Sequence, residues 1–153
     1  MPRLIFTSPV CRTFQRASCA LVLVAAGTSA AIAAEKTSIL IVPKTQIKYE
    51  KINPAISMAT VTGNRSTGAH GTFGKFPPKF ITPFHRHSGA YHGIVLKGVM
   101  TNPFKGEKNP KQMAAGSYWY VPANAVHATA CVSKVPCEFY FHAGSKFDFM
   151  PAK

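Results

Sequence analysis

The stretch YHGIVLKGVM, residues 91–100, decides the fold class because it is the strongest β-strand signal in the chain. It is rich in β-branched and apolar residues and is interrupted at Gly98. Shorter runs of similar character surround it, namely ISMATVTGN (56–64), HGTFGKFPP (70–78), SYWYVP (117–122) and CEFYFHAG (137–144). Turn residues separate these runs, and no segment after residue 35 shows a sustained 3.6-residue period. The sequence therefore predicts an all-β protein with strands spaced as in a sandwich or barrel.

Histidines gather just before this strand, in FHRHSGAYHG, residues 84–93. In an extended segment His85 and His87 point to the same face, and His92 shares a face with the apolar residues at 94 and 96. Downstream, His127 follows a Pro-Ala-Asn-Ala turn that lets the next strand start beside its neighbour. Four imidazoles from three segments can then meet at one point, which predicts a metal site in preference to a histidine-rich polar loop. His70, beside glycines, is assigned to a loop.

The histidine-rich segment resembles the first motif of the cupin families. That motif reads Gly, five residues, His-x-His, three or four residues, Glu, six residues, Gly. Here His85-x-His87 is followed after four residues by His92 in place of the glutamate, and then by Gly98. Tyr91 occupies the other permitted glutamate position.

The segment around residue 120 resembles the second cupin motif, which reads Gly, five residues, Pro-x-Gly, two residues, His, three residues, Asn. The matching positions are Gly116, Pro122, Asn124, His127 and Cys131. Asparagine is a reasonable substitute for the motif's second glycine where φ is positive. Three segments, HRHSGAYHGIVLKG, GSYWYVPANAVH and KFDFMPA, are similar to the DUF4437 branch of exported single-domain cupins.

The resemblance covers about residues 50–150 and implies a jelly-roll β-barrel, also called a double-stranded β-helix, with a metal near one mouth. It implies metal ligands at His85, His87, His92 and His127. Imidazole ligands suit a divalent transition metal, here Fe, Mn, Ni, Cu or Zn. Further candidates for the pocket wall, or for groups behind the ligands, are Tyr91, Tyr118, Tyr120, Tyr140 and His142.

The expected function is that of a metal-binding exported cupin, and the first expectation is an oxygenase-type enzyme, a metal-dependent dioxygenase acting on a small organic molecule. No carboxylate lies near the histidines in sequence, so paired-carboxylate chemistry is disfavoured and the metal must do most of the chemistry. The alternatives are a non-catalytic metal-binding, ligand-binding or sensor protein with a closed Zn site, and a Lewis-acid isomerase or lyase. Many cupins pair through their sheets, which makes a homodimer a candidate assembly.

The N-terminal third predicts a signal peptide over residues 1–33, ahead of a cupin domain over residues 34–153. Basic residues precede an apolar run, and Ala31-Ile32-Ala33 fits a cleavage site, so cleavage is expected near Ala33 or Ala34 and the protein is expected to be periplasmic or secreted. The alternative is a retained membrane anchor, but the purely apolar core is short, and we expect no stable anchor.

Removal of residues 1–33 leaves 15 basic and five acidic residues, a net charge of +10. The lysines are scattered through turns, which is not typical of a nucleic-acid-binding face. Only Cys131 and Cys137 remain in the mature chain. In an exported protein two cysteines six positions apart can form a disulfide, and the alternative is a thiolate metal ligand.

Overall fold

The computed structural model describes residues 38–152, and the predicted signal peptide lies outside the described residues. One short 3₁₀ turn, η1 (Lys44–Gln46), precedes the strands. The strands are β1 (Glu50–Lys51), β2 (Ser57–Gly63), β3 (His70–Phe76), β4 (His85–Arg86), β5 (Tyr91–Lys97), β6 (Val99–Thr101), β7 (Met113–Ala114), β8 (Tyr118–Val121), β9 (Ala130–Cys131), β10 (Cys137–Ala143) and β11 (Met150–Pro151). Among residues 38–152 no helix has the length and apolarity needed to cross a lipid bilayer.

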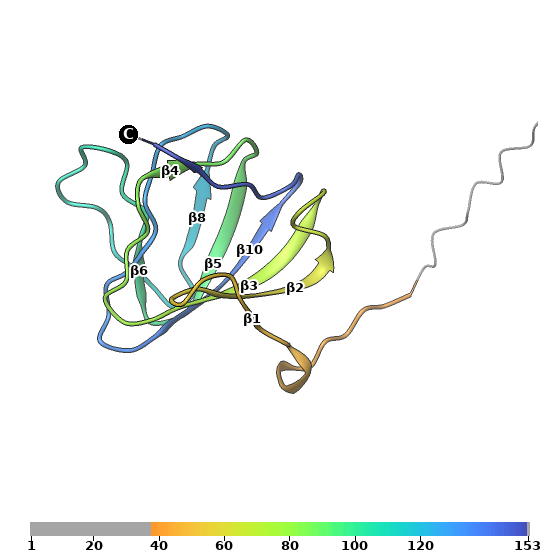
Figure 1. Cartoon of the computed structure of the whole chain (residues 1–153). Coiled ribbons are helices and arrows are strands. Elements are labelled where there is room, and N and C mark those ends of the chain that lie inside the picture. Colours follow the sequence, from red (N-terminus) through yellow and green to blue (C-terminus); the bar gives the residue numbers. More distant parts are fainter. Residues whose placement is uncertain (1–37, 153) are drawn as a thin grey trace, which may run out of the picture. The chain divides into compact units, whose positions relative to one another are not determined.

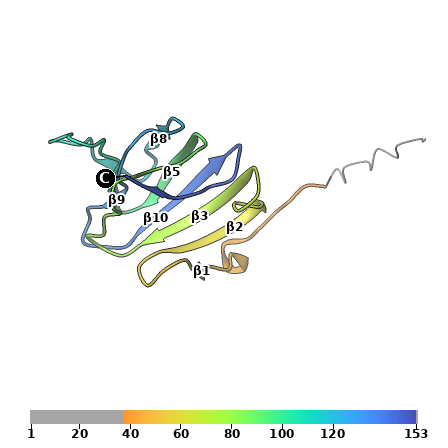
Figure 2. The ribbon, with the colours of Figure 1, turned by 45° about the horizontal axis from the view of Figure 1, so that its top comes forward.

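The larger layer is a six-stranded antiparallel sheet in the order β1-β2-β3-β10-β5-β8, and Figures 1 and 2 show β3, β10 and β5 side by side at its centre. Burial alternates along its strands as a half-buried sheet requires. In β10 the residues at 137, 139, 141 and 143 are buried, while those between them are intermediate or exposed. In β5 the residues at 91, 93 and 95 are buried. The apolar face of this sheet therefore covers the core.

The second layer combines a three-stranded sheet, β7-β6-β9, with the pair β11-β4. Isolated bridges between Ile81 and Ala130 and between His85 and His127 join these two parts. The C-terminal segment crosses this layer near β4, with which β11 pairs (Figure 1). Two antiparallel layers around one core form the expected jelly-roll β-barrel.

A disulfide between Cys131 in β9 and Cys137 in β10 links the two layers. Both sulfurs are used in this bond, so the thiolate-ligand alternative does not hold for this pair. The chain turns from β5 into β6 at Gly98, whose φ of 82° and close approach to the Cys137 sulfur leave no room for a side chain. Asn124 has φ of 62°, which confirms the expectation of positive φ at this motif position.

The core is largely aromatic and lies between the layers. Its largest members include Phe76, Trp119, Phe139 and Phe141. His70 is also part of the interior: it begins β3, is 2% exposed and bonds Thr72 Oγ1 through Nδ1 at 2.8 Å. Its assignment to a loop was wrong, because the chain after the glycine-containing turn enters the sheet at once.

Candidate metal centre

Three buried imidazoles meet inside the barrel mouth: those of His85, His87 and His127. His85 and His87 project from β4 and its continuation, and His127 lies opposite, where His85 and His127 exchange two backbone hydrogen bonds of 2.9 Å. The candidate ligand nitrogens all lie within 4.8 Å of one another. A centre therefore exists no more than 4.8/√3, about 2.8 Å, from each nitrogen, against about 2.0–2.1 Å for a zinc–imidazole bond. Within the described part of the chain this is the one cluster of three or more such ligands.

Backbone carbonyls hold all three rings in one orientation. The Nδ1–H of His85 donates to Pro83 O at 2.8 Å, that of His127 donates to Ala125 O at 2.9 Å, and that of His87 donates to Asp148 O. A ring whose Nδ1 is the donor keeps the lone pair on Nε2, so all three Nε2 atoms are available as ligands. The Nε2 of His87 is buried without a hydrogen-bond partner. A bound cation would satisfy this otherwise costly atom.

The three histidines are held neutral. Burial lowers the pKa of His85 and of His87 to about 4, against the weaker opposing effect of their backbone hydrogen bonds. Burial also lowers the pKa of His127. Neutral imidazole is the form that ligates a metal, so the site presents three ready ligands with no charge of their own.

Tyr91 stands beside this cluster. Its hydroxyl lies 3.0 Å from His127 Nε2, and because Nδ1 of that ring is the donor to Ala125, the phenol donates this hydrogen bond. The Tyr91 side chain is buried, and burial raises its pKa to about 12. A neutral phenol therefore points at the same space as the ligand nitrogens.

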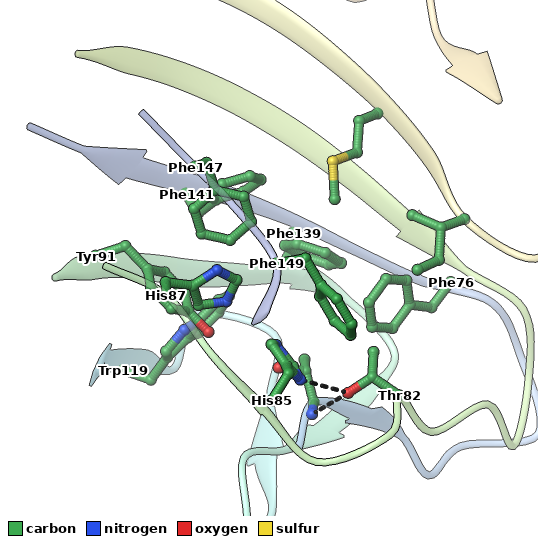
Figure 3. Close-up of a pocket in the computed structure, with 13 residues that line it drawn as sticks. Phe76, Thr82, His85, His87, Tyr91, Trp119, Phe139, Phe141, Phe147 and Phe149 are labelled. Atoms are coloured by element: carbon green, nitrogen blue, oxygen red, sulfur yellow. Dashed lines mark hydrogen bonds between the residues drawn. The ribbon is translucent and has the colours of Figure 1, made fainter. Parts of the chain in front are cut away.

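An apolar cavity of about 60 Å³ opens next to His85, His87 and Tyr91 (Figure 3). Its wall carries no charged side chain, and the polar groups besides the histidines and Tyr91 are the hydroxyls of Thr82 and Thr129 and the indole of a tryptophan. The remaining lining residues are Ile56, Met58, Phe76, Trp119, Phe139, Phe141, Phe147 and Phe149. The space suits a small group with few polar atoms.

The C-terminal segment closes one side of the site. Phe147 stacks on His87 with ring centroids 4.0 Å apart, and Phe149 stacks on His85 at 4.3 Å. Between them, the Asp148 carboxylate accepts hydrogen bonds from Ser88 N at 2.8 Å and Ser88 Oγ at 2.6 Å. These bonds and the nearby Lys146 lower the pKa of Asp148, the Ser88 bonds being the larger cause. The segment KFDFMPA, residues 146–152, supported the family resemblance, but no role at the site was predicted for it.

His92 does not join the other histidines, and its prediction as a fourth ligand is corrected. It is exposed on the outer face of β5, opposite in direction to Tyr91, which alternation in a strand places inside. Outside it contacts His142 and Tyr118.

Most of the other predicted pocket residues also lie outside. Tyr118 and Tyr120 are 60% and 55% exposed, and Tyr140 and His142 lie on the outward-facing positions of β10. Their inward neighbours are the tryptophan and phenylalanines of the core. Of the five predicted pocket residues, Tyr91 lines the cavity.

Comparison with known proteins agrees with this architecture. Residues 72–143 match the model of the cupin domain family. The polyketide cyclase RemF from Streptomyces resistomycificus superposes with a TM-score of 0.65 at 16% identity, covering 76% of this chain and 87% of the other. An RmlC-like cupin from Shewanella frigidimarina gives 0.56 at 18% identity, covering 76% and 94%.

A structure of oxalate oxidase gives a TM-score of 0.54 at 18% identity, covering 66% of this chain and 57% of the other. At these identities the likeness shows the fold alone. No curated protein sequence matches the chain.

Proposed function

We propose that this protein, which has the fold and a matching domain of the cupin superfamily, is a metal-dependent enzyme of the oxygenase type that acts on a small organic molecule. One observation carries the proposal: three buried imidazoles present their Nε2 atoms to one point, and two of them, His85 and His87, also line an apolar cavity. Three protein ligands, where a closed structural zinc site has four, leave coordination positions for other molecules. The outward position of His92 therefore counts against the closed-site alternative.

The residues fit a divalent transition metal such as Fe, Mn, Ni, Cu or Zn. His85, His87 and His127 would hold it, and their neutral nitrogens would leave its charge uncompensated. When bound, such an ion supplies Lewis acidity and, if redox-active, the activation of dioxygen. Phe147 and Phe149 stack on the rings of His87 and His85, keep them in place and shield them from water.

The wall of the cavity favours a particular kind of substrate. An anionic oxygen would be attracted to the uncompensated charge, while the phenylalanine rings would contact an apolar remainder. No lysine or arginine lines the cavity, so a second anionic group would have no partner there. The Tyr91 hydroxyl is placed to donate a hydrogen bond to an atom held beside His127. The substrate class we propose is a small monoanion with a compact apolar body.

The test begins with the metal content of protein purified from its native compartment, measured by elemental analysis. We expect about one transition-metal ion per chain to remain after dialysis, to be lost in His87→Ala and to be kept in Tyr120→Ala, which serves as the control on the outer face. Metal kept in His87→Ala would contradict the ligand set.

Dioxygen consumption by the metal-loaded protein is then measured with a panel of small aliphatic and aromatic monocarboxylates. Turnover that requires dioxygen supports the oxygenase proposal. Turnover that continues without dioxygen would replace it with Lewis-acid isomerase or lyase chemistry. Neither kind of turnover, with metal bound, would favour a binding or sensor role.

We also propose that the chain is exported. The support is the predicted signal peptide over residues 1–33 together with the Cys131–Cys137 disulfide, since such bridges persist in oxidising compartments. Cell fractionation with N-terminal sequencing of the mature protein tests this. A mature chain that begins at Met1 and stays in the cytoplasm would contradict it.

A further inference from the structure

His92 and His142 form a pair on the outer face of the six-stranded sheet, away from the buried cluster. The two residues are direct cross-strand partners in β5 and β10. Their ring nitrogens, Nε2 of His92 and Nδ1 of His142, lie 3.3 Å apart. Two ligands on a tetrahedral ion with bonds of 2.0–2.1 Å are also about 3.3 Å apart. The pair therefore already has the spacing of two ligands on one ion.

The surroundings orient the pair and leave room for an ion. Tyr118 OH lies 3.3 Å from His92 Nδ1. In the tautomer whose Nδ1–H donates to the phenol oxygen, His92 Nε2 carries the lone pair and accepts the hydrogen bond from His142 Nδ1–H, whose proton a bound ion would replace. The pair lines a hollow of about 200 Å³ whose other residues are uncharged. No cation in that lining repels a divalent ion.

We infer that His92 and His142 bind a divalent transition metal of the borderline class, such as Zn²⁺ or Cu²⁺, at a surface site separate from the buried centre. Two imidazoles leave about half of the coordination positions open to water or to a further ligand. The second imidazole acts intramolecularly and strengthens binding about 100-fold or more over a single exposed histidine. Tyr118 is a positioning residue, since it acts through His92.

The experiment is a calorimetric titration of the metal-free mature chain with Zn²⁺. We expect two zinc ions per wild-type chain and one in His92→Gln and in His142→Gln. Tyr118→Phe should weaken the surface site about tenfold. Tyr120→Phe, an exposed neighbour on the same strand as Tyr118, is the matched control and should bind two ions. Far-UV circular dichroism checks that these exposed substitutions leave the fold unchanged.

The outcomes separate this inference from the proposed function. Two ions in His142→Gln would overturn the surface site, as would a single wild-type ion that His87→Ala removes. A single wild-type ion that His142→Gln removes would support the surface site and contradict the buried centre.

Discussion

Tyr91→Phe tests how the buried cluster changes when a metal binds. In the metal-free protein the Tyr91 hydroxyl donates to His127 Nε2 at 3.0 Å, and His127 is fully buried. That same Nε2 is the atom we assign to the metal. The hydrogen bond and the metal bond therefore compete for one lone pair, and binding must break the hydrogen bond.

The size of the effect follows from this competition. Removing the hydroxyl leaves a buried acceptor unpaired, which costs about 1–3 kcal/mol in the metal-free protein. The metal-bound protein does not carry this cost, because the metal then occupies His127 Nε2. The mutation should therefore lower the unfolding free energy of the metal-free chain by about 1–3 kcal/mol. By the thermodynamic cycle it should tighten metal binding about 5–150-fold.

Urea denaturation of the metal-free protein measures the change in unfolding free energy, and calorimetric titration with Zn²⁺ measures the change in metal affinity. Tyr120→Phe is the control, since it removes the same hydroxyl from a residue that is 55% exposed, and both measurements should stay near wild type. The reasoning is refuted if Tyr91→Phe weakens zinc binding. That result would make Tyr91 a ligand in the bound state.

Three further predictions concern other parts of the structure. Phe147→Leu removes the ring stacked at 4.0 Å on His87 and should weaken zinc binding at the buried centre about tenfold; unchanged affinity would show that the stacking does not position the ligand. Reduction of the Cys131–Cys137 disulfide, which closes a loop of separation six, should lower the unfolding free energy by about 2 kcal/mol in urea denaturation, and coincident curves for the two forms would contradict this. Burial lowers the pKa of His70 to about 4, so the unfolded chain takes up its proton first as pH falls. Between pH 6.5 and pH 4 the unfolding free energy should therefore drop by about 2–3 kcal/mol more in wild type than in His70→Gln. Parallel plots of unfolding free energy against pH for the two proteins would refute the lowered pKa of His70.

The fold was predictable because its signals are local. Alternation and turn residues marked the long strands. The disulfide was one of two alternatives for the cysteine pair, and the positive φ of Asn124 was expected from its place in the cupin motif. The meeting of His85, His87 and His127 was also predicted, since two of them share a strand face and the third follows a motif turn. The short strands β4, β9 and β11 carry too few residues for a periodic signal, so the role of the C-terminal segment could not be predicted.

The face of β5 that points into the core was predicted wrongly, because both faces of this strand carry apolar residues. His92 was expected inside together with the isoleucine and leucine that share its face, yet those two are 42% and 46% exposed. The deciding residue is Gly93, where a side chain would come within 2.4 Å of the Trp119 ring. Packing of a tryptophan from β8 against this glycine fixes which face of β5 is inside, and a contact between strands is not visible from one strand's sequence.

The spacing to Gly98 favours Tyr91 over His92 as the residue at the glutamate position of the motif. Six residues separate Tyr91 from Gly98, which is the spacing between glutamate and glycine in the cupin motif, whereas five separate His92 from it. The structure agrees with that count, because Tyr91 lies inside beside His127. A phenol in place of a carboxylate removes an anionic ligand and adds a hydrogen-bond donor at the same point. The chemistry of this centre therefore depends on a neutral ligand set with one adjacent proton donor, which a site built with glutamate would not have.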